Sequence, residues 1–279
     1  MAAVSDQMPH ESTSDALRNA ENTLRDLIDR VMSSKHGPGW QASSDLTGGR
    51  CRKWQDKQRR ETSIPGTMPE HRLLYYADLG ELLDLILSNW ECFADCFGDQ
   101  ERFTQMTSLL RQYRNKVLHG RDLLSHERYL ILGITGLIRS AVTIHRTRRD
   151  SAMAERYFPR LEYLKDSLGN IVGPGIATIV ADQLVVGSMV EFAANAFDPM
   201  GDQIEYCFYL AEPTGAYLLH RAWGPEATWA WPVTEPHIGS KTVVCIIRSP
   251  RPYHLRGKHD DVLLLEYTVI PAEPTGAAA

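Results

Sequence analysis

The sequence predicts an α+β protein of two domains, an N-terminal all-α helical bundle followed by a C-terminal all-β sandwich. Before about residue 150, apolar residues recur at helical spacing in several segments. Beyond that point, Gly, Pro and aromatic residues become more frequent, and apolar residues alternate or form short runs. A chain of 279 residues also suits two domains. We place the helical domain at residues 13–149 and the β domain at residues 157–272.

The first domain is expected to be a bundle of four to five helices with short connecting turns. Ser14 or Asp15 caps the first helix and Asp99 caps a later one, because short polar side chains accept hydrogen bonds from free N–H groups. Gly120 is a natural C-terminal cap. Residues 41–49 form a loop, and Pro65, Gly66 and Pro69 interrupt the chain. The expected helical segments cover about 14–36, 50–61, 73–87, 90–98, 99–119 and a long stretch from Ser125.

The second domain is expected to be an antiparallel β-sandwich of about seven short strands. Turn signals at 198–202 and 213–215 separate two of the strand pairs. Residues 1–12 and 271–279 are polar or small and lack periodicity, so we expect them to be disordered or tail segments. The expected strands cover 160–163, 177–180, 189–196, 204–210, 217–221, 242–248 and 262–269.

Charge and cysteine usage narrow the classes of function. The net charge is −5, and the acidic second half argues against broad nucleic-acid binding there. Basic clusters at 50–60, 111–121 and 146–149 either contact phosphates or form solvated helix faces. No apolar run approaches the roughly 20 residues of a membrane span, and the N-terminus does not read as a signal peptide. Five scattered cysteines favour a reducing, cytoplasmic setting.

One segment, Gln112 to Gly120, carries a pattern with chemical meaning. Arg114 is followed directly by Asn115, and His119 comes five residues after the arginine. Spacing alone is not specific, because it recurs at Arg30/His36, Arg121/His126 and Arg139/His145. The context is more telling, because a periodic helix precedes the segment and a glycine follows the histidine. Together with the upstream residues Leu79–Leu82, Asn89–Trp90, Phe93 and Phe97–Gly98, this segment resembles the HEPN superfamily over about residues 15–148.

These residue types suit metal-independent RNA cleavage. RNA supplies its own nucleophile, the 2′-hydroxyl. Histidine titrates near neutrality and serves as acid or base, and arginine grips phosphate oxygens with a planar fork. Asn115 and His119 lie four residues apart on one helix face, whereas Arg114 lies about 140° away from His119. Two facing copies of the helix would bring both groups to one phosphate.

The resemblance implies an endoribonuclease whose active site forms between the subunits of a homodimer or larger homo-oligomer. It assigns Arg114 to phosphate binding, His119 to acid–base work and Asn115 to support. Arg111, Tyr113, Lys116 and Arg121 are the expected RNA contacts. It requires no metal and no cofactor, and it implies a toxin or anti-phage role. An inert HEPN adaptor that dimerises and binds RNA or a protein is the alternative, and nucleotide binding or modification without cleavage is a third.

Other motifs point to structure more than to chemistry. Cys92 and Cys96 could share one helix face, but no second Cys/His pair accompanies them, so we expect buried thiols. Cys207 and Cys245 lie in predicted strands that could face each other across the sandwich. Residues 189–206 resemble the strand–turn–strand of polycystic-kidney-type and cadherin-like immunoglobulin modules, with Asp198 and Asp202 read as turn residues rather than calcium ligands. Such an Ig-like domain would serve as a sensor, as an oligomerisation arm or as a docking surface for a protein partner.

Overall fold

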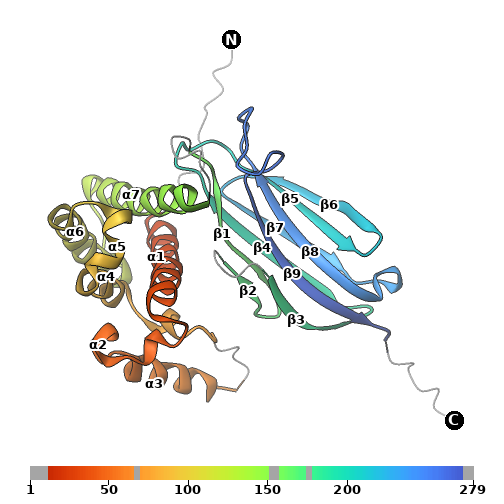
Figure 1. Ribbon diagram of the computed structural model, residues 1–279, viewed down its shortest axis with the longest axis horizontal. Helices are drawn as coiled ribbons and strands as arrows, with labels where there is room; N and C mark the ends of the chain where they lie inside the picture. The colour runs from red at the N-terminus through yellow and green to blue at the C-terminus, as the bar shows by residue number, and fades with distance from the viewer. Residues whose placement is uncertain (1–11, 66–69, 151–156, 174–177, 273–279) are drawn as a thin grey trace. The chain divides into compact units, whose positions relative to one another are not determined.

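The computed structural model describes residues 12–65, 70–150, 157–173 and 178–272. The chain divides into two compact units, Met1–Val142 and Thr143–Ala279, with the division inside the last helix. A helical region precedes a β region, so the predicted α+β order is confirmed (Figure 1). The predicted breaks at Gly66 and Pro69 and the predicted terminal tails at 1–11 and 273–279 lie outside the described residues.

The helical unit follows the predicted segments closely, with two differences in the segments and one in a helix cap. Residues 41–49, predicted as a loop, contain a single helical turn, α2. The predicted helix over 73–87 is a 3-10 turn, Leu73–Tyr76, followed by a separate α-helix capped by Asp78. Ser12, rather than Ser14 or Asp15, caps the first helix. In the described residues the α-helices are α1 (Thr13–His36), α2 (Ser44–Thr47), α3 (Cys51–Thr62), α4 (Leu79–Ser88), α5 (Trp90–Phe97), α6 (Gln100–Leu118) and α7 (Ser125–Asp150).

Glu81 explains why a new helix starts at Leu79 and why the basic helix α3 packs beside it. Glu81 and Asp78 form a capping box, in which each side chain accepts from the other's backbone N–H. The same carboxylate accepts from Lys53 Nζ at 2.6 Å and from the buried Trp54 Nε1 at 3.1 Å. Burial alone would raise the pKa of Glu81, but these hydrogen bonds outweigh it and lower the pKa. Part of the basic cluster at 50–60 is therefore structural.

One apolar core holds the helical unit together. It is built from the inner faces of α1, α4, α6 and α7, on which buried residues recur three and four positions apart. The cluster includes Leu24, Ile28, Leu82, Leu110 and Ile138, each fully buried. The core therefore fixes which sides of α6 and α7 point inward and which are left for other contacts.

The β unit consists of two sheets that share a second core. One sheet has the order β2-β1-β4-β7 and the other has the order β3-β9-β8-β5-β6 (Figure 1). Side chains from both sheets meet in the core, among them Phe192, Trp231, Tyr206 and Leu265. The strands are β1 (Arg160–Asp166), β2 (Ile171–Val172), β3 (Thr178–Val185), β4 (Met189–Phe197), β5 (Glu205–Glu212), β6 (Gly215–Trp223), β7 (Glu226–Pro232), β8 (Gly239–Arg248) and β9 (Asp261–Ile270).

Two strand-level expectations need correction. The described residues hold nine strands rather than seven, because the two-residue β2 and the tryptophan-rich β7 were not predicted. β7 alternates buried and exposed residues but is bounded by Pro225 and Pro232, which obscured it. The β3–β9 pair is parallel, so the sandwich is not wholly antiparallel. Residue 177, the predicted first residue of β3, lies outside the described residues.

Cys207 and Cys245 differ from the prediction, whereas residues 198–202 form a turn as predicted. Cys207 and Cys245 lie on the neighbouring strands β5 and β8 and pair with Ile246 and Phe208, so they point to opposite faces of one sheet rather than across the sandwich. All five cysteines are free. Asp198 and Asp202 both form ion pairs with Arg251, and Asp198 also accepts from the Met200 backbone in the predicted turn.

The described residues contain neither a membrane-spanning helix nor a cluster of metal-binding side chains. None of the helices there is long and apolar enough to cross a membrane. No three His, Cys, Asp or Glu side chains in that part of the chain gather as a metal site would require.

Candidate functional site

The candidate site lies at the C-terminal end of α6. Asp99 caps the start of this helix by accepting from the Arg102 backbone at 2.7 Å. Phe103, Leu110 and Tyr113 face the core and fix the rotation of the helix. His119 is the C-terminal cap, and Gly120 follows with a φ of 62°, a conformation that favours glycine. The motif predicted from sequence therefore stands where a helix ends and a tight turn begins.

Arg114 points toward α1 and is partly buried. Its Nε lies 3.5 Å from Glu21 Oε1, an ion-pair distance, although this buried nitrogen forms no hydrogen bond. Glu21 also accepts from Arg25 at 3.1 Å, so one carboxylate serves two guanidinium groups. The Arg114 side chain is 21% exposed. It is thus oriented by α1 yet still partly accessible to a ligand.

Asn115 and His119 are both exposed. They lie one turn apart on the same face of α6, and the His119 backbone N–H donates to the Asn115 carbonyl at 3.3 Å. Arg114 lies about 140° from His119 around the helix. The fold therefore places Arg114 beside α1 and presents His119 and Asn115 on another side of the helix.

The four predicted RNA contacts have different environments. Arg111 donates to Asp84 at 2.6 Å, and Lys116 forms an ion pair with Glu127 on α7. Tyr113 is 9% exposed and belongs to the core. Arg121 is exposed, and no ion pair or side-chain hydrogen bond involves it among the described residues. The structure leaves Arg121 without a side-chain partner in the described residues and places the other three in contacts within the fold. In the basic cluster at 146–149, Arg146 is likewise buried against Asp261.

Glu127 joins the two helices on either side of the motif turn. It accepts from Lys116 on α6 and from the Leu124 backbone at 3.0 Å. The hydrogen bond from Lys116 is the main cause of its lowered pKa. The ionised carboxylate therefore fixes the turn that carries Gly120 and Arg121.

We expect Glu127→Gln to have a lower free energy of unfolding than the wild type at neutral pH. In acid, the two proteins should have the same free energy of unfolding. The pKa of Glu127 is lower in the folded state than in the unfolded state, so its ionised carboxylate stabilises the fold at pH values above the unfolded-state pKa. This stabilisation is lost as the pH falls through the folded-state pKa. Urea unfolding of both proteins from neutral to acidic pH measures the difference. Asp122→Asn, which changes an exposed carboxylate with no ion pair among the described residues, is the matched control. A difference that stayed constant with pH would contradict the assignment.

Exposed apolar side chains lie beside the motif on α6 and along the next helix, α7. Leu118, next to His119, is 60% exposed, and on α7 the exposed fractions are 37% for Leu130 and 47% for Leu137. Leu130 and Leu137 are seven residues apart and share a helix face with Gly133, beside which a side chain would meet open space. Both α6 and α7 thus present uncovered apolar side chains in the described part of the chain.

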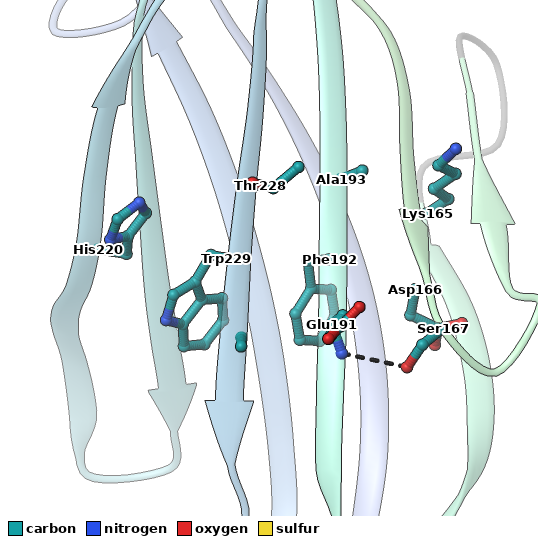
Figure 2. A pocket seen from close by; sticks show the side chains of 10 residues that line it. Lys165, Asp166, Ser167, Glu191, Phe192, Ala193, His220, Thr228 and Trp229 are labelled. Atoms are coloured by element: carbon teal, nitrogen blue, oxygen red, sulfur yellow. Dashed lines mark hydrogen bonds between the residues drawn. The ribbon is translucent and has the colours of Figure 1, made fainter.

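The β unit has a pocket of its own, with a volume of about 540 Å³. Trp229 and Phe192 stack at 5.2 Å between ring centroids and form part of its lining. The Glu191 backbone N–H donates to Ser167 Oγ at 3.1 Å. Figure 2 shows this hydrogen bond and the Phe192 and Trp229 rings. Asp166, another lining residue, is occupied by Tyr267 and the Asn170 amide. The pocket combines stacked aromatic rings with polar side chains.

Fold and motif together define a two-domain α+β protein whose helical domain carries an Arg-Asn-x-x-x-His sequence at a helix end. Residues 15–142 match the family model of the Swt1-like HEPN domain, which supports a HEPN domain in the helical region. No curated protein matches the chain. Among solved structures, the N-terminal domain of PorA matches with 8% identity and a TM-score of 0.22, covering 41% of this chain and 97% of that chain.

Sequence reasoning missed two residues that organise this site. Glu21 and Glu127 each contact a motif residue from another helix. Both were visible only as ordinary acidic residues on amphipathic helices. Their role depends on helix packing, for which a single sequence gives no local signal.

Proposed function

We propose that this protein is a metal-independent HEPN endoribonuclease that cuts RNA at a site shared by two subunits. The observation that carries the proposal is the separation of Arg114 from Asn115 and His119 on α6. A single copy holds a partly buried arginine beside α1 and an exposed histidine on another side of the helix. HEPN domains are frequently ribonucleases, and the family match covers this region.

The proposed reaction uses only the RNA and the side chains of two α6 helices. His119 takes the proton from a 2′-hydroxyl, whose oxygen attacks the adjacent phosphorus. The bond from phosphorus to the 5′-oxygen breaks, and the proton is returned to that leaving oxygen. The products are a 2′,3′-cyclic phosphate and a 5′-hydroxyl. Arg114 binds the phosphate oxygens as negative charge develops on them, and Asn115 orients the imidazole.

The apolar surface beside the motif supports the dimer. Leu118, Leu130 and Leu137 are exposed in one copy and would be covered by the same surfaces of a second copy. Such a contact would bring the two His119 side chains toward the shared interface, because Leu118 is next to the histidine. We further propose that the protein acts in the cytoplasm as a toxin or anti-phage effector. Its β unit would be an Ig-like module for sensing, oligomerisation or docking.

The test is a cleavage assay on total RNA and a structured tRNA pool with EDTA present. We expect the wild type to cut and to leave 2′,3′-cyclic phosphate ends. A 2′-O-methylated copy of a cleaved RNA should resist, because its blocked oxygen cannot attack. Cleavage that requires added metal, or that leaves 3′-hydroxyl ends, would contradict the proposed chemistry.

A non-catalytic adaptor that dimerises and binds RNA or a protein is the second candidate. The ion pair of Arg114 with Glu21 favours it, because a structural arginine would have the same environment. An adaptor would bind RNA or a protein partner without cutting any RNA, and Arg114→Ala would then lower thermal stability and leave binding unchanged.

A further inference from the structure

The helical unit has a pocket next to the motif. Neither the motif nor the family match gives this pocket a function. It lies where α1 begins, α6 ends and α7 begins, and its volume is about 650 Å³. This volume is within the range of roughly 300–1,000 Å³ that is usual for small-ligand pockets. Val117 and Leu132 form apolar parts of its lining, and Arg121, Arg128 and Tyr129 contribute polar groups.

Three side chains of the pocket lining have no side-chain partner among the described residues. Tyr129 is 74% exposed, and no ring contact or hydrogen bond of its side chain is found among the described residues. Arg121 and Arg128 are also exposed, and the described part of the chain offers neither an ion pair. Asp122 is the one acidic residue in the described lining. The pocket thus joins an open aromatic ring to two guanidinium groups that have no ion pair in the described residues. Single-stranded nucleic acid needs such a stacking surface and such phosphate contacts.

The pocket is continuous with the motif. Val117 lies three residues after Arg114 on the same face of α6, and Gly120 and Arg121 directly follow His119. Of the apolar side chains assigned to the dimer, Leu118 follows the lining residue Val117, whereas Leu130 and Leu137 are about 80–100° from Tyr129 around α7. A second copy that covers Leu130 and Leu137 would leave Tyr129 on another side of α7.

We propose that this pocket binds a nucleotide of single-stranded RNA next to the cleaved phosphate, with its base stacked on Tyr129 and its phosphates held by Arg121 and Arg128. This inference rests on the proposed function and names the substrate class as unpaired RNA. A paired base would not stack on Tyr129, because its faces are covered by neighbouring bases.

The experiment measures binding of a fluorescent, fully 2′-O-methylated single-stranded oligonucleotide to the full chain by anisotropy, with subunit mass measured in parallel. Tyr129→Ala should weaken binding about 5- to 150-fold, the range for loss of one base stack. Tyr129→Phe keeps the ring and should bind like the wild type. Arg128→Ala should weaken binding and reduce the salt dependence of log K by about 0.7, as expected for one lost phosphate contact.

Matched controls separate the pocket from general effects. Arg102→Ala removes the same charge at the other end of α6, and Tyr217→Ala removes an exposed ring from the β unit. Both should bind like the wild type. The inference is overturned if Tyr129→Ala binds as tightly as the wild type, if the wild type does not bind the oligonucleotide, or if Tyr129→Ala becomes monomeric with unchanged RNA affinity. The last result would assign the pocket to a second copy of the chain.

The outcome also separates this inference from the proposed reaction. Tyr129-dependent binding without cleavage of normal RNA would support the pocket and refute the ribonuclease. If the wild type cleaves RNA but Tyr129→Ala binds the oligonucleotide as tightly as the wild type, the ribonuclease is supported and the pocket is refuted.

Discussion

Replacing His119 by alanine is expected to lower the rate of RNA cleavage about 10²- to 10⁴-fold, the usual contribution of a general acid–base group. Arg114→Ala should cost about 10²- to 10³-fold, because charge on the phosphate oxygens loses its cation. Arg114→Lys should recover only part of this loss, since a lysine keeps the charge but lacks the planar fork. Gln112→Ala, at an exposed neighbouring position, is the matched control and should cleave normally.

Mixing the two inactive proteins tests whether the site is shared. Suppose each site takes Arg114 from one subunit and His119 from the other. A mixed dimer of Arg114→Ala and His119→Ala subunits then keeps one intact site. Random exchange should restore about a quarter of wild-type activity, because half of the dimers are mixed and each has one of two sites. Activity that stays absent, although mass measurements show mixed dimers of folded subunits, would place both residues in one subunit.

Replacing Leu137 by glutamate is expected to split the dimer and, with it, the activity. Leu137 is 47% exposed in one copy and would be covered by its partner. Burying two like charges near a two-fold axis costs several kcal/mol, which weakens association about 100-fold or more. Glutamate is also a good helix former, so α7 itself should persist. Light scattering should give the mass of one 31.5 kDa chain instead of two.

Leu218→Glu is the control for this variant. Leu218 has a similar exposed fraction, 42%, but lies on β6 in the β unit. It should remain dimeric and active. If Leu218→Glu became monomeric while Leu137→Glu stayed dimeric, the β unit would form the dimer and the proposed helix contact would be wrong.

The helices were predictable because their signals are local. Asp99 was correctly identified as the cap of α6, and α1, α3 and α7 lie close to the predicted ranges. Capping and apolar periodicity act within a few residues, so one sequence contains them. The missed strand β7 and the parallel β3–β9 pair depend on partners that are distant in sequence. No local pattern specifies such partners.

The sequence by itself determined the order of a helical and a β region, and it placed Arg114, Asn115 and His119 at a helix end before a glycine. Helical geometry also gave the angle between Arg114 and His119. Only the tertiary structure decided which cations are available. It paired Arg111 with Asp84 and Lys116 with Glu127, set Arg114 beside Glu21, and left Arg121, Arg128 and Tyr129 around a pocket. The physical reason is that an ion pair between helices forms only where packing brings two side chains within a few ångströms.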